Sequence, residues 1–220
     1  MKKACFFLII CLLFGANSFA QQGKYGTYYD QRATLFEKLP ITSSDIVFLG
    51  NSLTDGCEWA ELFGNSHIKN RGISGDVVLG IYDRIDPVLK GKPAKIFLLT
   101  GINDVSHDLT ADSVLVMYKQ LVSKIKSGSP KTKLYIQSLF PVNDEFTRFP
   151  KVHNKTQVIL DINKGLKQLA KEYRCVYIDI YSHLFAQGTQ SLDKKYTNDG
   201  LHLLAPGYLV WKELLKPYIK

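Results

Sequence analysis

The chain has 220 residues, enough to enclose one sizeable hydrophobic core, and 45% of them are apolar. Its formal net charge is +8 at pH 7, from 28 Lys and Arg against 20 Asp and Glu. The lysines are scattered along predicted helices without a compact basic block, so nucleic acid is excluded as an expected partner. No cofactor is expected, because dinucleotide and phosphate-loop motifs and the spacings of zinc and calcium ligands are all missing from the sequence.

The N-terminus has the layout of a cleaved secretory signal peptide over residues 1–20. Two lysines follow the initiator methionine, an apolar core runs from Ala4 to Phe14, and small residues lead to Ala20. This apolar segment is shorter than the roughly 20 residues that a membrane-spanning helix needs, and no later stretch approaches that length. We therefore expect cleavage near Ala20 and a secreted or periplasmic mature chain over 21–220, with no transmembrane segment.

The mature chain is expected to be one domain in which strands and helices alternate after a lead-in over 21–44. The predicted strands are Asp45–Leu49, His67–Asn70, Lys95–Thr100, Lys133–Ser138 and Val176–Ile180. The predicted helices are Tyr28–Leu39, Glu58–Gly64, Val77–Leu89, Ala111–Lys126, Lys155–Tyr173 and Ala205–Ile219. Short apolar strands covered on both faces by helices predict an α/β fold with a five-stranded parallel sheet in a three-layer, flavodoxin-like arrangement.

The predicted helix Ala111–Lys126 carries a regular apolar stripe. Helical spacing places its members on one face, which we interpret as core: Leu115, Tyr118, Leu121, Val122 and Ile125.

Four polar motifs lie where predicted strands end or beside the last helix. They read Gly50-Asn51-Ser52-Leu53, Gly72-Ile73-Ser74-Gly75-Asp76, Gly101-Ile102-Asn103-Asp104 and Asp199-Gly200-Leu201-His202. In a parallel sheet, the loops at the carboxyl ends of the strands converge on one crevice, so these motifs are predicted to share a site.

The last motif supplies a carboxylate and an imidazole three residues apart. This spacing lets Asp199 hold one nitrogen of His202 while the other remains free to accept the proton of a serine, for which Ser52 is the candidate. An Asp-x-x-His turn alone is a weak signal, since most such histidines are ordinary turn residues. The prediction of a Ser-His-Asp set gains its weight from the other motifs.

The four motifs, in this order, resemble the SGNH superfamily, also called GDSL esterases and lipases, from about Asp45 to the C-terminus. The resemblance implies a carboxylic ester hydrolase with Ser52 as nucleophile, His202 as general base and acid, and Asp199 as its orienting group. Asn51 departs from the family pattern, which usually has Asp there; we expect it to support the loop without altering the nucleophile.

By the same resemblance, three groups form the oxyanion hole: the backbone N–H of Ser52, the backbone N–H of Gly75 and the side-chain amide of Asn103. Gly72 is a close competitor for Gly75. Two cysteines, Cys57 and Cys175, remain after signal-peptide removal, and the sequence predicts that both are free thiols.

The sequence is most similar to the branch containing platelet-activating-factor acetylhydrolase-like proteins and bacterial sialate O-acetylesterases. This implies hydrolysis of short acyl esters, with O-acetyl groups on carbohydrates such as sialic acid as the expected substrate. Arg71, or lysine side chains near the mouth of the crevice, are candidates for holding an anionic sugar, although a plain surface charge is also consistent with the position of Arg71. Two alternatives stay open: a lysophospholipase or thioesterase, and a catalytically inactive glycan-binding module. The sequence does not define the oligomeric state.

Overall fold

A computed structural model describes residues 23–219 of the chain, so the predicted signal peptide over 1–20 lies outside the described residues. A five-stranded, all-parallel sheet forms its centre, with the order β2-β1-β3-β4-β5. The strands are β1 (Ile46–Gly50), β2 (Ile68–Gly72), β3 (Lys95–Leu99), β4 (Lys133–Gln137) and β5 (Val176–Ile178). The predicted fold class is confirmed.

The order in which strands are added to the sheet reverses between β1 and β3, which are parallel neighbours. After β1 the chain crosses to β2 on one side, and it then returns to place β3 on the other side of β1. Loops leaving the carboxyl ends of these two strands therefore diverge, and a crevice opens between them at this switch point. The register pairs Gly50 at the end of β1 with Gly72 of β2 and Leu99 of β3, so three loops begin at the same height.

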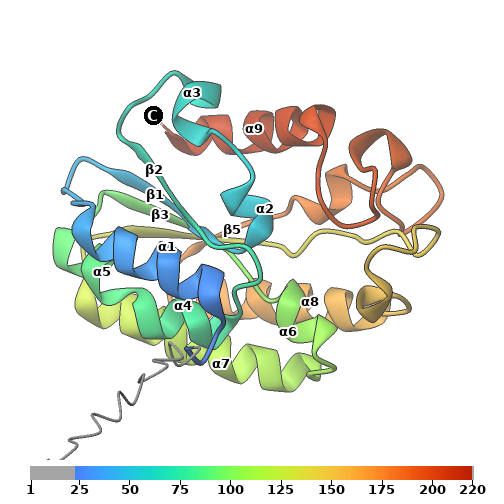
Figure 1. Ribbon diagram of the computed structural model, residues 1–220, viewed down its shortest axis with the longest axis horizontal. Coiled ribbons are helices and arrows are strands. Elements are labelled where there is room, and N and C mark those ends of the chain that lie inside the picture. Colours follow the sequence, from blue (N-terminus) through green and yellow to red (C-terminus); the bar gives the residue numbers. More distant parts are fainter. Residues whose placement is uncertain (1–22, 220) are drawn as a thin grey trace, which may run out of the picture.

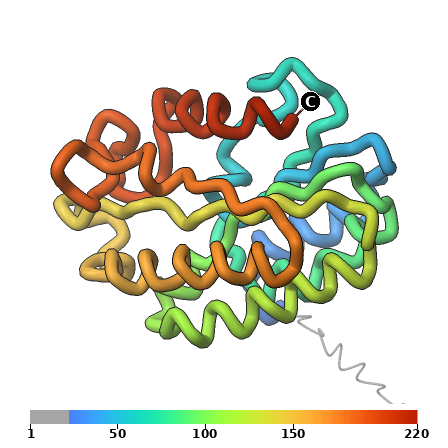
Figure 2. The backbone as a smooth tube through the Cα atoms, turned by 180° about the vertical axis from the view of Figure 1, so that it is seen from behind, coloured from blue at the N-terminus to red at the C-terminus, as the bar shows by residue number. Residues whose placement is uncertain are grey.

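Helices cover both faces of the sheet and make three layers. Figure 1 shows one layer above the sheet, composed of α3 (Trp59–Phe63) and α9 (Ala205–Ile219). The layer below contains α1 (Thr27–Lys38), α4 (Val78–Arg84), α5 (Asp86–Gly91), α6 (Ile102–Ser106), α7 (Ala111–Gly128) and α8 (Thr156–Glu172). Figure 2, from behind, shows the same separation of the red C-terminal helix from the green and orange helices.

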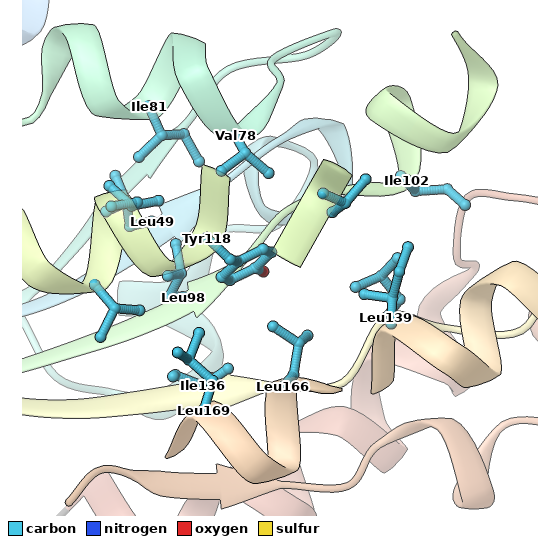
Figure 3. Packing of buried hydrophobic residues seen from close by; sticks show 14 of the residues in the cluster. Leu49, Val78, Ile81, Leu98, Ile102, Tyr118, Ile136, Leu139, Leu166 and Leu169 are labelled. Carbon is cyan, nitrogen blue, oxygen red and sulfur yellow. The ribbon is translucent and has the colours of Figure 1, made fainter. Parts of the chain in front are cut away.

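The alternation of side chains along each strand divides the core between the two faces. In β1, Val47 and Leu49 join the core under the larger helical layer, whereas Ile46 and Phe48 join the core under α3 and α9. Both sets are buried, which explains why the strand is apolar without interruption. Figure 3 shows the first core around Tyr118 of α7.

Four of the five residues of the predicted α7 stripe are fully buried. Leu115 is partly buried, and Val114, which the stripe omitted, takes the inner position. The hydroxyl of Tyr118 donates to the carbonyl of Thr100 at 2.9 Å and accepts from its N–H at 3.2 Å. Because Thr100 directly follows β3, this residue of α7 fixes the start of the loop that carries Asn103.

Two predicted elements differ from the structure. The single helix expected over Val77–Leu89 is divided into α4 and α5, and Pro87 lies in the first turn of α5, where its missing N–H breaks no hydrogen bond. Strand β2 runs to Gly72 and is not uniformly apolar. It is an edge strand, and the side chain of its Asn70 donates to the carbonyls of Thr54 and Cys57.

The lead-in contains α1, one residue displaced from its predicted bounds. Its Phe36 is buried, and three guanidinium groups lie 4.6, 4.9 and 5.9 Å from the ring centre, those of Arg32, Arg71 and Arg84. These cation-π contacts attach α1 to β2 and α4. Within residues 23–219, no helix has the length and apolar character needed to cross a membrane.

Candidate active site

Ser52 lies at the start of a short helix that follows β1 directly. Asn51 caps this helix, α2 (Ser52–Asp55), by accepting the N–H of Leu53 on its side-chain oxygen at 3.1 Å. The expected loop-supporting role of Asn51 thus has a physical basis, since an amide oxygen caps a helix as an Asp oxygen does. Its Nδ2 is buried and has no hydrogen-bond partner among residues 23–219.

His202 and Asp199 occupy a turn that precedes α9. Nδ1 of His202 lies 2.8 Å from Oδ2 of Asp199, and Nε2 lies 2.9 Å from Oγ of Ser52. The other carboxylate oxygen of Asp199 accepts the backbone N–H groups of Leu201 at 2.9 Å and His202 at 2.8 Å. The turn therefore orients the carboxylate and the imidazole together, and the structure brings all three predicted residues into one hydrogen-bonded chain.

Asp199 remains ionised in this environment. Partial burial acts to raise the pKa of Asp199, but hydrogen bonds from the backbone of His202 and Leu201 and from the imidazole outweigh it and leave the pKa below its usual range. The negative charge of Asp199 beside Nδ1 stabilises the imidazolium that forms when Nε2 accepts a proton. Phe149 closes the other side of the imidazole, with its ring edge-on at 5.0 Å between centres.

Three N–H donors lie beside Ser52. Neither the backbone N–H of Ser52 nor that of Gly75 donates a hydrogen bond within the described part of the chain. Asn103, in the first turn of α6, donates one amide hydrogen to the carbonyl of Asp76 at 2.8 Å, which leaves its second hydrogen for a ligand. Gly75, Ser52 and Asn103 all line one pocket, whereas the N–H of Gly72 is occupied by the side chain of Asn70 at 2.8 Å. The geometry therefore favours Gly75 over Gly72.

The loop of Gly75 is anchored on both sides of that residue. On one side, Oδ2 of Asp55 accepts the N–H and the hydroxyl of Ser74 at 3.1 and 2.7 Å, which links the loop to α2. Gly75 itself has a φ of +83°, a conformation that glycine adopts without steric strain.

On the other side, a buried ion pair attaches the loop to the sheet. Nε of Arg84 donates to Asp76 at 2.7 Å, and its NH2 group donates to the carbonyls of Gly50 and Arg71 at 3.1 and 3.0 Å. Burial raises the pKa of Asp76 to about 6, although Arg84 acts in the opposite direction. One guanidinium thus joins the ends of β1 and β2 to the loop that bears Gly75.

The triad opens onto a pocket of about 570 Å³. One part of its lining is polar and contains Ser52, Ser74, Gly75, Asn103, Ser106 and His202. The other part is Leu201 and the segment Arg148–Val152, which includes a short 3-10 helix, η1 (Pro150–Val152). Near Ser52, a second space between side chains that include Leu53, Ile102 and Phe140 has no room for even a water molecule. The pocket therefore does not extend between these side chains.

Arg71 does not lie at this pocket, and the prediction that it contacts substrate is wrong. It is only 5% exposed in β2, packs on Phe36 and donates to the carbonyls of Asn70 and Leu39 at 2.9 and 3.4 Å. Burial lowers the pKa of its guanidinium to about 10. It is also not a surface charge, because the lead-in helix covers it.

Sequence reasoning missed the wall formed by Arg148, Phe149 and Lys151. These residues lie between β4 and α8 in a segment without a polar motif, so only the folded chain shows that they reach the triad. The one available signal was the length of this connection, from Ser138 to Lys155, since long ordered loops often carry function. Ser106 and the Asp76–Arg84 pair were missed as well.

The structure provides no metal-binding cluster of His, Cys, Asp or Glu within residues 23–219. The two cysteines there are free, as predicted. Burial raises the pKa of the Cys57 thiol to about 12, so it stays protonated and unreactive at neutral pH.

The sequence pattern of the GDSL-like lipase/acylhydrolase family matches residues 48–210. The chain is 26% identical over 180 residues to the N-acylneuraminate cytidylyltransferase of Escherichia coli O18:K1:H7; this match covers 80% of the chain and 41% of that protein. It is also 26% identical over 171 residues to the platelet-activating factor acetylhydrolase IB subunit alpha2 of Rattus norvegicus, covering 74% of the chain and 71% of the subunit.

A GDSL-like lipase from Bacteroides thetaiotaomicron has a similar structure, with a TM-score of 0.75 and 25% identity over 87% of this chain and 96% of the other. The chain belongs to the GDSL-like lipase/acylhydrolase family and is a carboxylic ester hydrolase.

Proposed function

We propose that this family member is a serine esterase in which Ser52, His202 and Asp199 carry out hydrolysis through an acyl-enzyme. The single observation that supports it most strongly is the unbroken chain of hydrogen bonds from Asp199 through His202 to Ser52 at the floor of an open pocket. This is the arrangement that activates a serine hydroxyl, whose proton the imidazole accepts as the oxygen attacks.

The reaction has two halves. Oγ of Ser52 attacks the ester carbonyl and passes its proton to Nε2 of His202; the N–H groups of Ser52, Gly75 and Asn103 then hold the oxyanion. Collapse of this intermediate expels the alcohol, which takes the proton back from His202. Water attacks the acyl-serine by the same route, and the carboxylic acid leaves.

The proposed substrates are short-chain esters, above all O-acetyl groups on carbohydrates such as sialic acid. Two observations support a short acyl group and a large alcohol. The space between Leu53, Ile102 and Phe140 admits no water molecule, so no acyl channel runs there, whereas the pocket that Ser52 lines is large enough for a sugar. The similarity to an enzyme named for N-acylneuraminate and to a platelet-activating factor acetylhydrolase subunit is consistent with this choice.

A lipid acyl hydrolase is the second candidate, because Leu201, Phe149 and Val152 provide an apolar wall on which a longer chain could lie. A binding module without activity is disfavoured by the intact triad. We further propose that residues 1–20 direct export and are removed, so that the enzyme acts outside the cytoplasm. The mass of the protein recovered from the exporting cell tests this, since removal of residues 1–20 gives a species that begins at Gln21.

The activity experiment compares p-nitrophenyl acetate, butyrate and octanoate as substrates of the mature protein and of Ser52→Ala. We expect acetate to be hydrolysed fastest and the variant to lose activity by at least about a thousandfold, because the nucleophile is removed. A preference for octanoate would favour the lipid alternative. Equal rates for the two proteins would rule out Ser52 as nucleophile.

A further inference from the structure

Two cations line the pocket without an ion-pair or hydrogen-bond partner among the described residues. Arg148 and Lys151 are exposed, both lie in the pocket lining, and neither forms a hydrogen bond or an ion pair with another described residue. Arg148 contacts the ring of Phe149, and its guanidinium carbon lies 6.0 Å from the ring centre. Phe149 in turn packs on His202, so this cation stands one aromatic ring away from the triad.

No carboxylate among the described residues lines the pocket to balance these charges. The neighbouring acidic groups have other hydrogen-bonded partners. Glu145 pairs with Lys194 at 2.6 Å, Asp144 accepts the N–H of Asn154 at 2.9 Å, and Asp108 pairs with Lys155 at 2.7 Å. The charge of Lys151 also lowers the pKa of Asp108, but the two side chains form no ion pair. Leaving His202 aside, the pocket lining therefore carries a formal charge of +2.

The segment that bears the two cations is internally braced. The Asp144 to Asn154 hydrogen bond closes its base, Nε2 of His153 contacts the carbonyl of Phe146 at 2.8 Å, and the buried side chain of Val152 anchors η1 in the core. This bracing keeps the backbone that bears the two cations at the pocket before a ligand arrives, so less backbone entropy is lost on binding.

We infer that Arg148 and Lys151 form a subsite that selects esters bearing an anionic oxygen group, a carboxylate, sulfate or phosphate, on the alcohol side of the scissile bond. This inference rests on the proposed function. In the proposed pose the short acyl group lies beside Ser52, and the alcohol extends along Phe149 toward the two cations. An exposed guanidinium and ammonium attract such a group both in the ground state and in the transition state, which raises kcat/KM mainly through KM.

The test uses 3-(4-acetoxyphenyl)propanoate, its neutral methyl ester and the corresponding propanesulfonate. The charge is separated from the leaving phenol by a saturated chain, so the three esters have similar intrinsic reactivity. We expect kcat/KM for the better of the two anionic esters to exceed that for the methyl ester by about two- to fivefold, the range that one exposed ion pair supplies. The ratio should fall toward one in 0.5 M NaCl, because salt screens exposed charges.

The variant Arg148→Gln/Lys151→Gln should reduce the ratio to near one. Its matched control is Lys171→Gln/Arg174→Gln, which removes the same two residue types at the same spacing at the opposite end of the sheet, before β5, and should leave the ratio unchanged. A ratio near one in the unaltered protein, or an equal ratio in the double variant with its unfolding temperature preserved, would overturn the subsite. If Ser52→Ala still removed the acetyl group from the neutral methyl ester compound, the proposed mechanism would instead be refuted.

Discussion

Asp104 is a buried carboxylate next to the proposed oxyanion donor Asn103. Both of its oxygens accept the N–H of Val78, at 3.3 and 3.1 Å, and the residue is 3% exposed. Burial raises its pKa from 3.8 to about 6, and the charge of Asp76 adds to the effect. In the folded protein this group therefore keeps a proton that it loses in the unfolded chain between about pH 4 and 6.

The consequence for stability follows from this difference in proton binding. The contribution of Asp104 is fully present below about pH 4 and is lost as the pH rises through about 6. Asp104→Asn keeps an acceptor for Val78 but removes the titration. Urea denaturation gives the free energy of unfolding of the variant minus that of the unaltered protein. We expect this difference to be more favourable to the variant at pH 7.5 than at pH 5.0, by about 1 kcal/mol. An advantage that stays constant between the two pH values would contradict the raised pKa.

Individual residues were predictable only where a short motif carried them. Ser52, Asn103, Asp199 and His202 stand in polar motifs at strand ends, and the structure gathers them around one pocket. Arg71 stands directly before such a motif, but in β2 its side chain packs on Phe36 of α1 and does not line the pocket. Whether a side chain beside a motif faces the site depends on strand register and on helix docking, which local sequence does not encode.

The turn between Thr197 and His202 is the element on which the triad depends. Gly200 within it has a φ of +84°, its carbonyl accepts the N–H of Asn143 at 2.9 Å, and its N–H donates to Oγ1 of Thr197 at 2.9 Å. A Cβ at this position would lie 2.5 Å from the backbone oxygen of Asn143, which cannot retreat without moving the segment that follows β4. The turn is thus held between its own hydrogen bonds and a neighbouring chain segment.

Gly200→Ala should displace this turn and separate His202 from Ser52. We expect kcat on p-nitrophenyl acetate to fall at least about tenfold, because catalysis is sensitive to shifts of an ångström or less. Gly188→Ala is the control: Gly188 has a φ of +76°, but a Cβ there meets nothing within 4 Å. It should lose about 1 kcal/mol of stability from backbone strain and keep its kcat. Equal kcat values for the two variants would show that the contact with Asn143 is unimportant.

At the scale of elements, predictions succeeded where hydrophobic periodicity was strong. The bounds of α7, α8 and α9 agree with expectation to within two residues. The short helices α2 and α6 were not predicted, because each has a single turn or little more and is stabilised by position rather than by sequence period. Both begin within three residues of the end of a strand, and this is how Ser52 and Asn103 come to flank the switch point.

At the scale of the whole molecule, α9 connects the layer formed by α3 and α9 to the active site. It starts three residues after His202, and its Trp211 is fully buried against Trp59 and Phe140, with ring centres at 4.6 and 4.7 Å. The indole N–H donates to Oε1 of Gln137, at the end of β4, at 2.6 Å. The position of the catalytic turn therefore depends on the packing of a complete helix on the sheet.

Trp211→Ala should destabilise the protein by about 3–5 kcal/mol, because it opens a large cavity and leaves the buried Gln137 without its donor. Since total stabilities are typically about 5–15 kcal/mol, a considerable part of the folding free energy would be lost. Urea denaturation measures this loss, and Leu209→Ala on the exposed face of the same helix is the control, with an expected change below about 0.5 kcal/mol. The esterase activity of Trp211→Ala should disappear at the temperature at which the fold is lost. Unfolding of Trp211→Ala and Leu209→Ala at the same urea concentration would show that α9 is not part of the cooperative core, and that the triad is positioned by its own turn alone.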